Sequence, residues 1–236
     1  MKYLGLHLDS RWCFEEHFDQ ILPRAERAAA ALDHLLPNLV GPSEWVRRLY
    51  KGVVRSMSMY GSPVWAGDLV ASRRGLTKLR RLQRVMAIRI ARGYRTISYE
   101  AVMTLASLTL FELLAERDTQ VYGRLRELRR GGAIPSASEV EVMRRQSQQG
   151  VLAKWKEHLE GKGGQRAVGA VNPSFDEWVN RGRGRLTYRV TQVFSGYGCF
   201  GHLHRIGKEV TDGCHHCEGG HRGSAQRILA ECSAWE

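Results

Sequence analysis

Long hydrophobic runs are missing from this chain of 236 residues. The longest uncharged, apolar-rich stretch, Ala101 to Phe111, is too short to span a bilayer, and the opening MKYLGLHLDSRW contains no apolar run of signal-peptide length. These absences argue against a membrane-spanning helix and a secretory signal. We therefore expect an intracellular protein of the nucleus, the cytoplasm or both, with no membrane partner. Hydrophobic residues still make up 43% of the chain, which is enough to form a core.

Acidic residues are scarce as well. The chain has 24 Asp and Glu against 36 Lys and Arg, which gives a net charge of +12. Such an excess favours polyanionic partners, and nucleic acid and anionic membrane surfaces are the two common kinds. The shortage is most pronounced over residues 71–95, a stretch rich in Lys and Arg that contains no acidic residue.

Residues 69–92 combine this positive charge with the periodicity of a helix. Leucines, Met86 and Ile90 recur at three-to-four spacing and would dock one face to the rest of the protein. Like charges at the same spacing destabilise a helix by roughly a few tenths of a kcal/mol per pair, so a phosphate backbone that neutralises them would relieve the repulsion. We predict sequence-independent, salt-sensitive binding of RNA and DNA here, and the alternative is a solvated basic face. The predicted phosphate-contacting residues are Arg73, Arg74, Lys78, Arg80, Arg81 and Arg84.

The rest of the chain is also predicted to be mainly α-helical. Apolar residues at helical spacing and capping signals predict further helices over residues 14–37 and 42–60, after Ser98, from a capping box at Thr109–Glu112, and from a capping box at Ser138–Glu141 to near Glu160. Only the opening KYLGLHLD alternates like a strand. It is predicted to be a single strand or the end of a hairpin whose partner is missing.

Motifs of catalysis are absent. The sequence contains no glycine-rich phosphate loop, no nucleophile elbow and no metal-binding pair of neighbouring aspartates. Asp9 stands alone and is predicted to be a turn residue, while His7, His17 and His34 lack a nucleophile partner. We therefore predict no catalytic residue in this chain and no small-molecule substrate.

Cysteines are few, but three of the five lie together in the C-terminal stretch GCHHCEGGHRGSAQRILAEC. An odd number of cysteines with a Cys-x-x-Cys in a basic chain indicates metal or redox chemistry rather than disulfides, and leaves Cys13 and Cys199 as ordinary buried thiols. Zinc takes four tetrahedral ligands. By spacing, these are predicted to be Cys214, Cys217, His221 and Cys232. The alternative is a set of unlinked buried thiols.

Five segments in succession give the chain a resemblance to a known family. They are KYLGLHLD, LYKGVVRSMSMYGSPVWAG, LRRLQRVMAIRIARGYRTISYEA, WVNRGRGRLTYRVTQVFSGYGCFGHLHRIG and CHHC followed by AECSAW. In this order they resemble the C-terminal part of a non-LTR (LINE-type) retrotransposon reverse transcriptase, closest to the insect group that inserts into ribosomal RNA genes. The resemblance covers essentially the whole chain, and the order of the segments is more specific than any one of them.

The resemblance implies a division into four parts. Residues 1–12 would be a palm-edge strand, residues 13–130 a thumb-like helical region, residues 131–164 a connecting helix and linker, and residues 165–236 a zinc-knuckle-like region that holds RNA or target DNA. The family's catalytic aspartates, fingers and endonuclease domain would precede Met1. The whole protein would thus be an RNA-directed DNA polymerase, and this chain alone is expected to be inactive.

Two positions depart from the family pattern. Arg227 stands where the family has its ligand histidine, and a guanidinium stays protonated and cannot bind a metal. Tyr197 likewise stands where the family usually has a histidine. Either His221 serves as the fourth ligand, or the zinc site is damaged and the chain is a relic of a decayed element. The rival interpretations are a stand-alone or domesticated zinc-dependent module that binds nucleic acid or protein, and an inert fragment.

Overall fold

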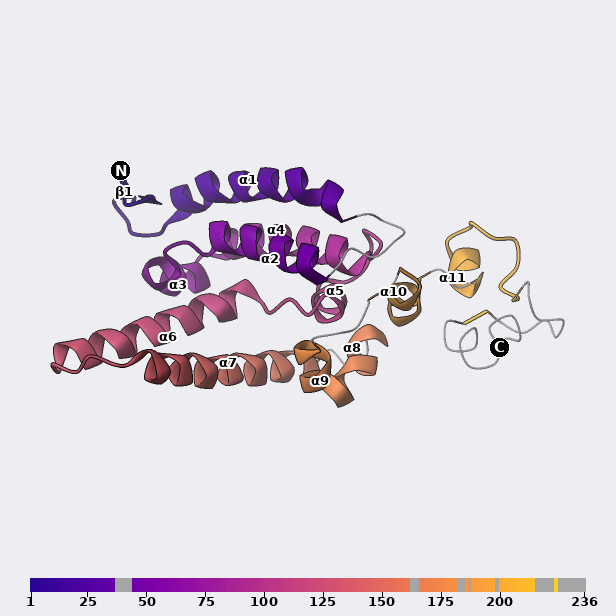
Figure 1. Cartoon of the computed structure of the whole chain (residues 1–236). Coiled ribbons are helices and arrows are strands. Elements are labelled where there is room, and N and C mark those ends of the chain that lie inside the picture. The colour runs from indigo at the N-terminus through magenta and orange to yellow at the C-terminus, as the bar shows by residue number, and fades with distance from the viewer. Residues whose placement is uncertain are drawn as a thin grey trace. The chain divides into compact units, whose positions relative to one another are not determined.

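The computed structural model describes residues 1–36, 44–161, 166–181, 186, 188–197, 200–214 and 223–224. Helices dominate these residues, and the strands among them form one small hairpin (Figure 1). The prediction of a mainly α protein is therefore confirmed. None of the helices described is long and apolar enough to cross a membrane.

The elements follow one another along the chain with short connections. They are β1 (Lys2–Tyr3), β2 (Leu6–His7), α1 (Glu15–Leu32), the 3-10 turn η1 (Asp33–Leu35), α2 (Glu44–Ser58), α3 (Ser62–Ala71), α4 (Arg73–Ala91), α5 (Tyr99–Leu105), α6 (Phe111–Arg130), α7 (Ala137–Glu160), α8 (Arg166–Val171), the 3-10 turn η2 (Asn172–Ser174), α9 (Phe175–Asn180), α10 (Tyr188–Ser195) and α11 (Phe200–Arg205).

The opening segment is a complete hairpin, so the prediction of a lone strand or of a missing partner is wrong. β1 and β2 pair antiparallel, with Tyr3 opposite Leu6. Leu4 and Gly5 form the turn between them with φ of 45° and 85°. A two-residue turn with both φ values positive matches the twist of the flanking strands. The alternating pattern predicts one strand because it continues through the turn.

The structure divides into two compact units, and each is assembled from separate stretches of the chain. The first unit comprises Met1–Pro37, Pro42–Met86 and Leu108–Gly161. The second comprises Asn38–Gly41, Ala87–Ser107 and Lys162–Glu236. The four consecutive regions implied by the resemblance stay a prediction.

Aromatic side chains form the core of the first unit. Phe18 of α1 packs edge-on against Trp65 of α3, with ring centroids 5.1 Å apart, and both rings are buried. The indole N–H of Trp65 donates to the carbonyl of Tyr60 at 2.9 Å, so its polar atom is satisfied inside the core. In the same unit α6 and α7 run side by side (Figure 1).

A close approach at Gly61 fixes the hairpin to the start of α3. Gly61 has φ 69°, and a Cβ at this position would come within 2.6 Å of the Leu6 side chain. Glycine suits the site because only a residue without Cβ adopts this φ freely and leaves room for Leu6. The Tyr60 hydroxyl also donates to the carbonyl of Leu4 at 2.7 Å.

The second unit is held by contacts between α5 and the helices that follow α7. The indole N–H of Trp178 donates to the carbonyl of Thr104 at 2.8 Å, and the Arg181 guanidinium donates to the carbonyl of Leu105 at 2.9 Å. The same guanidinium lies 3.7 Å from the centroid of the Trp178 ring. The bond from Arg181 satisfies the carbonyl of Leu105 at the C-terminal end of α5, whereas the carbonyl of Thr104 also accepts from the N–H of Ser107 at 3.1 Å.

The predicted helix over residues 69–92 is divided in the structure. Residues 69–71 belong to α3, which was not predicted, and Ser72 is extended between the two helices with φ −91° and ψ 93°. The Ser72 hydroxyl accepts from the backbone N–H of Gly75 at 3.1 Å, which caps the start of α4. The helix expected after Ser98 is confirmed, because the Ser98 side chain accepts from the N–H of Ala101.

Both predicted capping boxes are wrong. α6 begins after Leu110, and Glu112 pairs with Arg80 instead of returning to Thr109. α7 has its capping box at Ser136 and Glu139, two residues before the predicted one. The predicted end of this helix near Glu160 is confirmed.

Candidate nucleic-acid interface

One face of α4 is buried as predicted, apart from Leu76, which is half-buried. Leu79, Leu82 and Met86 are fully buried, and Ile90 is 3% exposed. Burial of this stripe fixes the rotation of the helix and thereby decides which cations reach the surface.

Gln83 lies within the buried stripe and was not predicted to have a role. Its side-chain amide nitrogen donates to the carbonyl of Thr109 at 2.6 Å, and its amide oxygen accepts from the N–H of Phe111 at 3.2 Å. The first backbone N–H groups of a helix have no partner within the helix. Gln83 therefore joins α4 to the start of α6. No local signal in the sequence distinguishes it from a surface glutamine.

Three of the six predicted phosphate-contacting residues form ion pairs with carboxylates of the first unit. Arg74 lies 3.6 Å from Asp19, and Lys78 pairs with the same carboxylate. The guanidinium of Arg80 contacts Glu112 at 2.7 Å. These pairs neutralise part of the positive face, so its cations are not equivalent.

Arg73 and Arg81 differ from those three. Both are exposed, and within the part of the chain that the structure describes neither side chain has an ion-pair partner. Together with the exposed Thr77 they follow the four-residue spacing of one helix face. Arg84, the sixth predicted residue, is half-exposed. The solvent-facing charge of α4 in the first unit is thus centred on Arg73 and Arg81.

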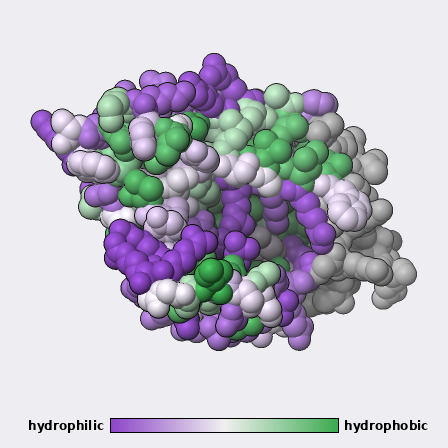
Figure 2. Space-filling view, turned by 60° about the vertical axis from the view of Figure 1, so that its left-hand side comes forward, coloured by the Kyte–Doolittle hydropathy of each residue, from purple (hydrophilic) through white to green (hydrophobic). Residues whose placement is uncertain are grey.

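An aromatic side chain is exposed on α2 in the same unit. Trp45 is 75% exposed, and the Arg48 guanidinium lies 5.5 Å from the centroid of its ring. Figure 2 shows apolar and hydrophilic side chains on the same face of the molecule, each gathered in several groups. An indole beside a guanidinium offers both a stacking surface and a positive charge.

The predicted zinc ligands fall mostly outside the described residues. Cys217, His221 and Cys232 lie there, as does Arg227, while Cys214 is described and buried. Among the residues that are described, no group of three or more His, Cys, Asp or Glu side chains is placed to hold a metal ion.

The backbone on either side of the Cys-x-x-Cys is joined by hydrogen bonds. The N–H of Gly223 donates to the carbonyl of Asp212 at 2.6 Å, and the carbonyl of Gly223 accepts from the N–H of Gly201 at 3.0 Å. The first of these bonds joins Asp212 to Gly223, which stand before and after Cys214, Cys217 and His221 in the sequence. Thiolate and imidazole are donors that zinc prefers.

Asp9 and Cys13 form a turn rather than a reactive pair. The Asp9 carboxylate accepts from the backbone N–H groups of Arg11 and Cys13 and from the Cys13 thiol. These hydrogen bonds, chiefly the one from the Cys13 backbone, lower the pKa of Asp9. The prediction of a turn role for Asp9 is confirmed. The prediction of a buried thiol is wrong for Cys13, which is half-buried, and Cys199 lies outside the described residues.

His17 is part of the aromatic core of the first unit. It is fully buried beside Phe18 and Trp65, and its Nδ1 accepts from the backbone N–H of His7 at 3.4 Å. Its Nε2 is buried and has no hydrogen-bond partner. Burial, with a smaller contribution from the His7 ring, lowers the pKa of His17 to about 4. Such an imidazole is neutral at physiological pH.

Comparison of the chain with known protein families, with curated proteins and with solved structures gave no match.

Proposed function

We propose that this chain is the thumb and C-terminal nucleic-acid-binding part of a non-LTR retrotransposon reverse transcriptase, and that it binds RNA and DNA chiefly through α4. The observation that carries the proposal is the pair of exposed arginines, Arg73 and Arg81, on a helix that contains no acidic residue. A thumb holds a template and primer of any sequence, and cations that contact phosphates bind without reading bases.

The ion pairs divide the six cations of α4 into two groups. Arg73 and Arg81 contact phosphates directly. Arg74 and Lys78 contact phosphates only by exchanging the carboxylate of Asp19 for a phosphate oxygen, and Arg80 holds α4 to α6 through Glu112. Exposed ion pairs are worth about 0.2–1 kcal/mol, so a phosphate can replace the Asp19 carboxylate at little cost.

The zinc-knuckle-like tail supplies the second part of the proposed function. Cys214, Cys217 and Cys232 would hold the metal as thiolates, with His221 in the position that Arg227 cannot fill. Zinc would serve a structural role and supply folding free energy to the tail. No step of catalysis is assigned to this chain, because the polymerase chemistry would belong to residues of the whole protein.

Fluorescence anisotropy with single-stranded RNA at several salt concentrations tests the proposal. We expect the double variant Arg73→Glu and Arg81→Glu to bind at least about 10-fold more weakly than the unmodified chain. The slope of log K against log[salt] should be shallower by about 1.4, since each lost phosphate contact removes about 0.7 for a single strand.

The matched control is the double variant Arg129→Glu and Arg144→Glu, which changes the net charge equally on the exposed surfaces of α6 and α7. It should lose much less affinity and keep the slope. Equal losses in the two double variants would show that only the net charge acts, and the assignment to α4 would then fail. The stand-alone zinc module would be favoured if chelation of zinc abolished RNA binding while both double variants kept the affinity of the unmodified chain.

A further inference from the structure

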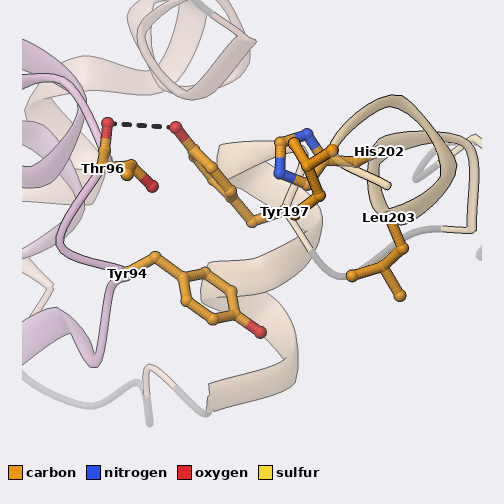
Figure 3. Close-up of a pocket in the computed structure, with 6 residues that line it drawn as sticks. Tyr94, Thr96, Tyr197, His202 and Leu203 are labelled. Atoms are coloured by element: carbon orange, nitrogen blue, oxygen red, sulfur yellow. Dashed lines mark hydrogen bonds between the residues drawn. The ribbon is translucent and has the colours of Figure 1, made fainter. Parts of the chain in front are cut away.

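The second unit contains a cavity of about 350 Å³ with mainly apolar walls. Its lining residues are Tyr94, Thr96, Tyr197, His202, Leu203 and Ile206. The labelled residues in Figure 3 come from two parts of the chain: the loop after α4, and the segment from the end of α10 into α11. Ile206 directly follows α11. The volume lies at the small end of the range for ligand pockets, about 300–1,000 Å³, and suits one planar ring system.

The backbone places Tyr94 in this cavity by ending α4 sharply. Arg92 adopts φ 56°, and the N–H of Gly93 donates to the carbonyl of Ile88 at 3.0 Å, which closes the helix end. The chain then turns, so that Tyr94 and Thr96 follow within a few residues. On the other side, Tyr197 comes directly after α10.

Both tyrosine hydroxyls are engaged in hydrogen bonds at the edge of the cavity. The Tyr94 hydroxyl accepts from the side-chain amide of Gln192 at 2.9 Å. The Tyr197 hydroxyl donates to the carbonyl of Thr96 at 3.0 Å (Figure 3). These bonds orient the two rings, so that the lining offers a ligand aromatic surface more than hydroxyl groups.

The aromatic rings form a contiguous group. The centroids of Tyr94 and Tyr197 lie 5.4 Å apart at an interplanar angle of 44°, and His202 meets Tyr197 edge-on at 4.6 Å. A planar ring inserted between two others needs about 7 Å between them, twice the contact distance of carbon atoms. A ligand ring therefore stacks on the group from the cavity side and does not insert between the tyrosines.

His202 adds a hydrogen-bond donor to this apolar lining. The Arg205 guanidinium lies 3.0 Å from Nδ1 of His202 and can only donate, so Nδ1 accepts and the proton of the neutral ring is on Nε2. Burial, with a contribution from Arg205, lowers the pKa of His202, which keeps the ring neutral.

The segments that form the cavity are basic in sequence, although Glu209 follows the last of them. The three segments that supply or flank its lining, residues 92–97, 188–197 and 200–208, contain no acidic residue. Of their cations, Arg95, Arg205 and Lys208 are exposed, whereas Arg92 is buried. A ligand with a flat apolar part and negative charges beside it matches this arrangement, whereas a neutral apolar side chain of a protein would not need the cations.

We propose that this cavity binds one unpaired base of an RNA or single-stranded DNA strand, stacked on Tyr94 and Tyr197, while the flanking cations contact the neighbouring phosphates. The proposal rests on the proposed function and names the part of the nucleic acid that the second unit recognises. It also gives Tyr197 a role. By the family resemblance this residue stands where a histidine is usual, whereas in the structure its ring and hydroxyl help to form the cavity. Stacking on aromatic side chains tolerates any base, since every base has a π-face.

The test compares Tyr94→Leu with Tyr94→Phe in the full chain. Both variants lose the hydrogen bond with Gln192, but only Tyr94→Phe keeps the aromatic face. The probes are single-stranded RNA of about 12 nucleotides, a length within the usual site sizes for single-strand binding, and an abasic strand with the same number of phosphates. Because one stacked base contributes about 1–3 kcal/mol, Tyr94→Leu should bind the RNA roughly 5- to 150-fold more weakly. Its affinity for the abasic strand should not change, and Tyr94→Phe should bind both strands like the unmodified chain.

A second measurement does not depend on a folded variant. A strand with one 2-aminopurine should lose fluorescence on binding the unmodified chain, because stacking on an aromatic ring quenches this base. Unquenched fluorescence, or equal losses in Tyr94→Leu and Tyr94→Phe, would overturn the proposal. So would displacement of the strand by equimolar AMP, which would indicate a site for free nucleotides, or by a neutral apolar peptide, which would indicate a protein-binding site.

The two proposals fail in different ways. A chain that binds neither the RNA nor the abasic strand contradicts nucleic-acid binding altogether. Suppose instead that the chain binds the RNA and the abasic strand with the same affinity, and that the double variant Arg73→Glu and Arg81→Glu binds neither. This result would support the proposed function and contradict only the base-binding cavity.

Discussion

At the scale of single residues, His17 shows how burial can couple protonation to folding. The side chain is fully buried, and its pKa is lowered to about 4. In the unfolded chain the pKa is near 6.5. Above pH 6.5 the imidazole is neutral in both states. As the pH falls from 6.5 toward 4, the unfolded chain takes up a proton that the folded chain refuses, so the free energy of unfolding decreases.

We predict that substitution His17→Leu makes the free energy of unfolding less dependent on pH between 6.5 and 4. A group with this shift changes the free energy of unfolding by up to about 1.4 kcal/mol per pH unit in this window. The variant lacks the group and should lose this part of the slope. Urea unfolding across this pH window measures both slopes. His34→Leu is the control, because His34 is exposed. An unchanged slope in His17→Leu would mean that the buried imidazole does not titrate differently in the two states.

At the scale of single elements, the sequence predicted the faces of α4 but not the roles of its arginines. The buried stripe follows from spacing within the helix, which local sequence contains. The partners of Arg80 and Lys78 are Glu112 and Asp19, which lie 32 and 59 residues away along the chain. No pattern within α4 distinguishes Arg80 from its neighbour Arg81, because the difference depends on helices that pack against it.

The capping boxes illustrate a different cause of error. The stretch PSASEVEV contains the Ser-x-x-Glu pattern twice, two residues apart. Both frames are chemically suitable, and the structure uses Ser136 and Glu139. The earlier frame adds residues 137 and 138 to α7, so it gains helical hydrogen bonds that the later frame would forgo. Glu141 is then free of the cap and pairs with Arg145 one turn later.

We predict that Arg80→Ala destabilises the first unit and that Arg81→Ala does not. The side chain of Glu112 is only 12% exposed, and one of its oxygens is already buried without a hydrogen-bond partner. Removing Arg80 would leave this carboxylate unpaired, at a cost of about 1–3 kcal/mol. An exposed arginine without an ion pair should change the free energy of unfolding by about 0.5 kcal/mol at most.

Chemical denaturation measures the free energy of unfolding of both variants. We expect Arg80→Ala to be the less stable variant and Arg81→Ala to be the weaker RNA binder. Arg80→Ala combined with Glu112→Gln should recover part of the lost stability, since the second change removes the unpaired charge. Equal stabilities of the two single variants would show that the ion pair with Glu112 does not hold α6 to α4.

At the scale of the whole molecule, local periodicity was enough to predict the fold class but not the division into units. Residues 108–161 join residues 1–37 and 42–86 in one unit, while the stretch 87–107 between them joins the C-terminal part. Such interleaving depends on contacts between residues far apart in sequence, for example the hydroxyl of Thr191 donating to the carbonyl of Ala91. The cavity at Tyr94 and Tyr197 was missed for the same reason, since its two sides are about a hundred residues apart.

The metal content of the intact chain decides between a zinc-dependent tail and a relic. A thiolate site with three cysteines needs one more donor to complete the tetrahedral set, and His221 is the nearest imidazole outside the Cys-x-x-Cys. If His221 fills this position, the site proposed from the family resemblance is complete without a histidine at position 227. If it does not, the set has three thiolates and no fourth ligand, since a guanidinium cannot bind a metal.

We predict that native mass spectrometry of the unmodified chain finds one zinc ion, and that His221→Ala loses it or holds it much more weakly. Cys214→Ser should lose zinc as well, because it removes a thiolate of the same set. Arg227→His serves as the opposite test: with His221 as ligand it should leave the stoichiometry at one. A chain that holds no zinc until Arg227 is changed to histidine would contradict the assignment of His221. That result would indicate that position 227 is the ligand position, as the proposed function implies, and the proposed base-binding cavity and α4 would then be the remaining candidates for binding nucleic acid.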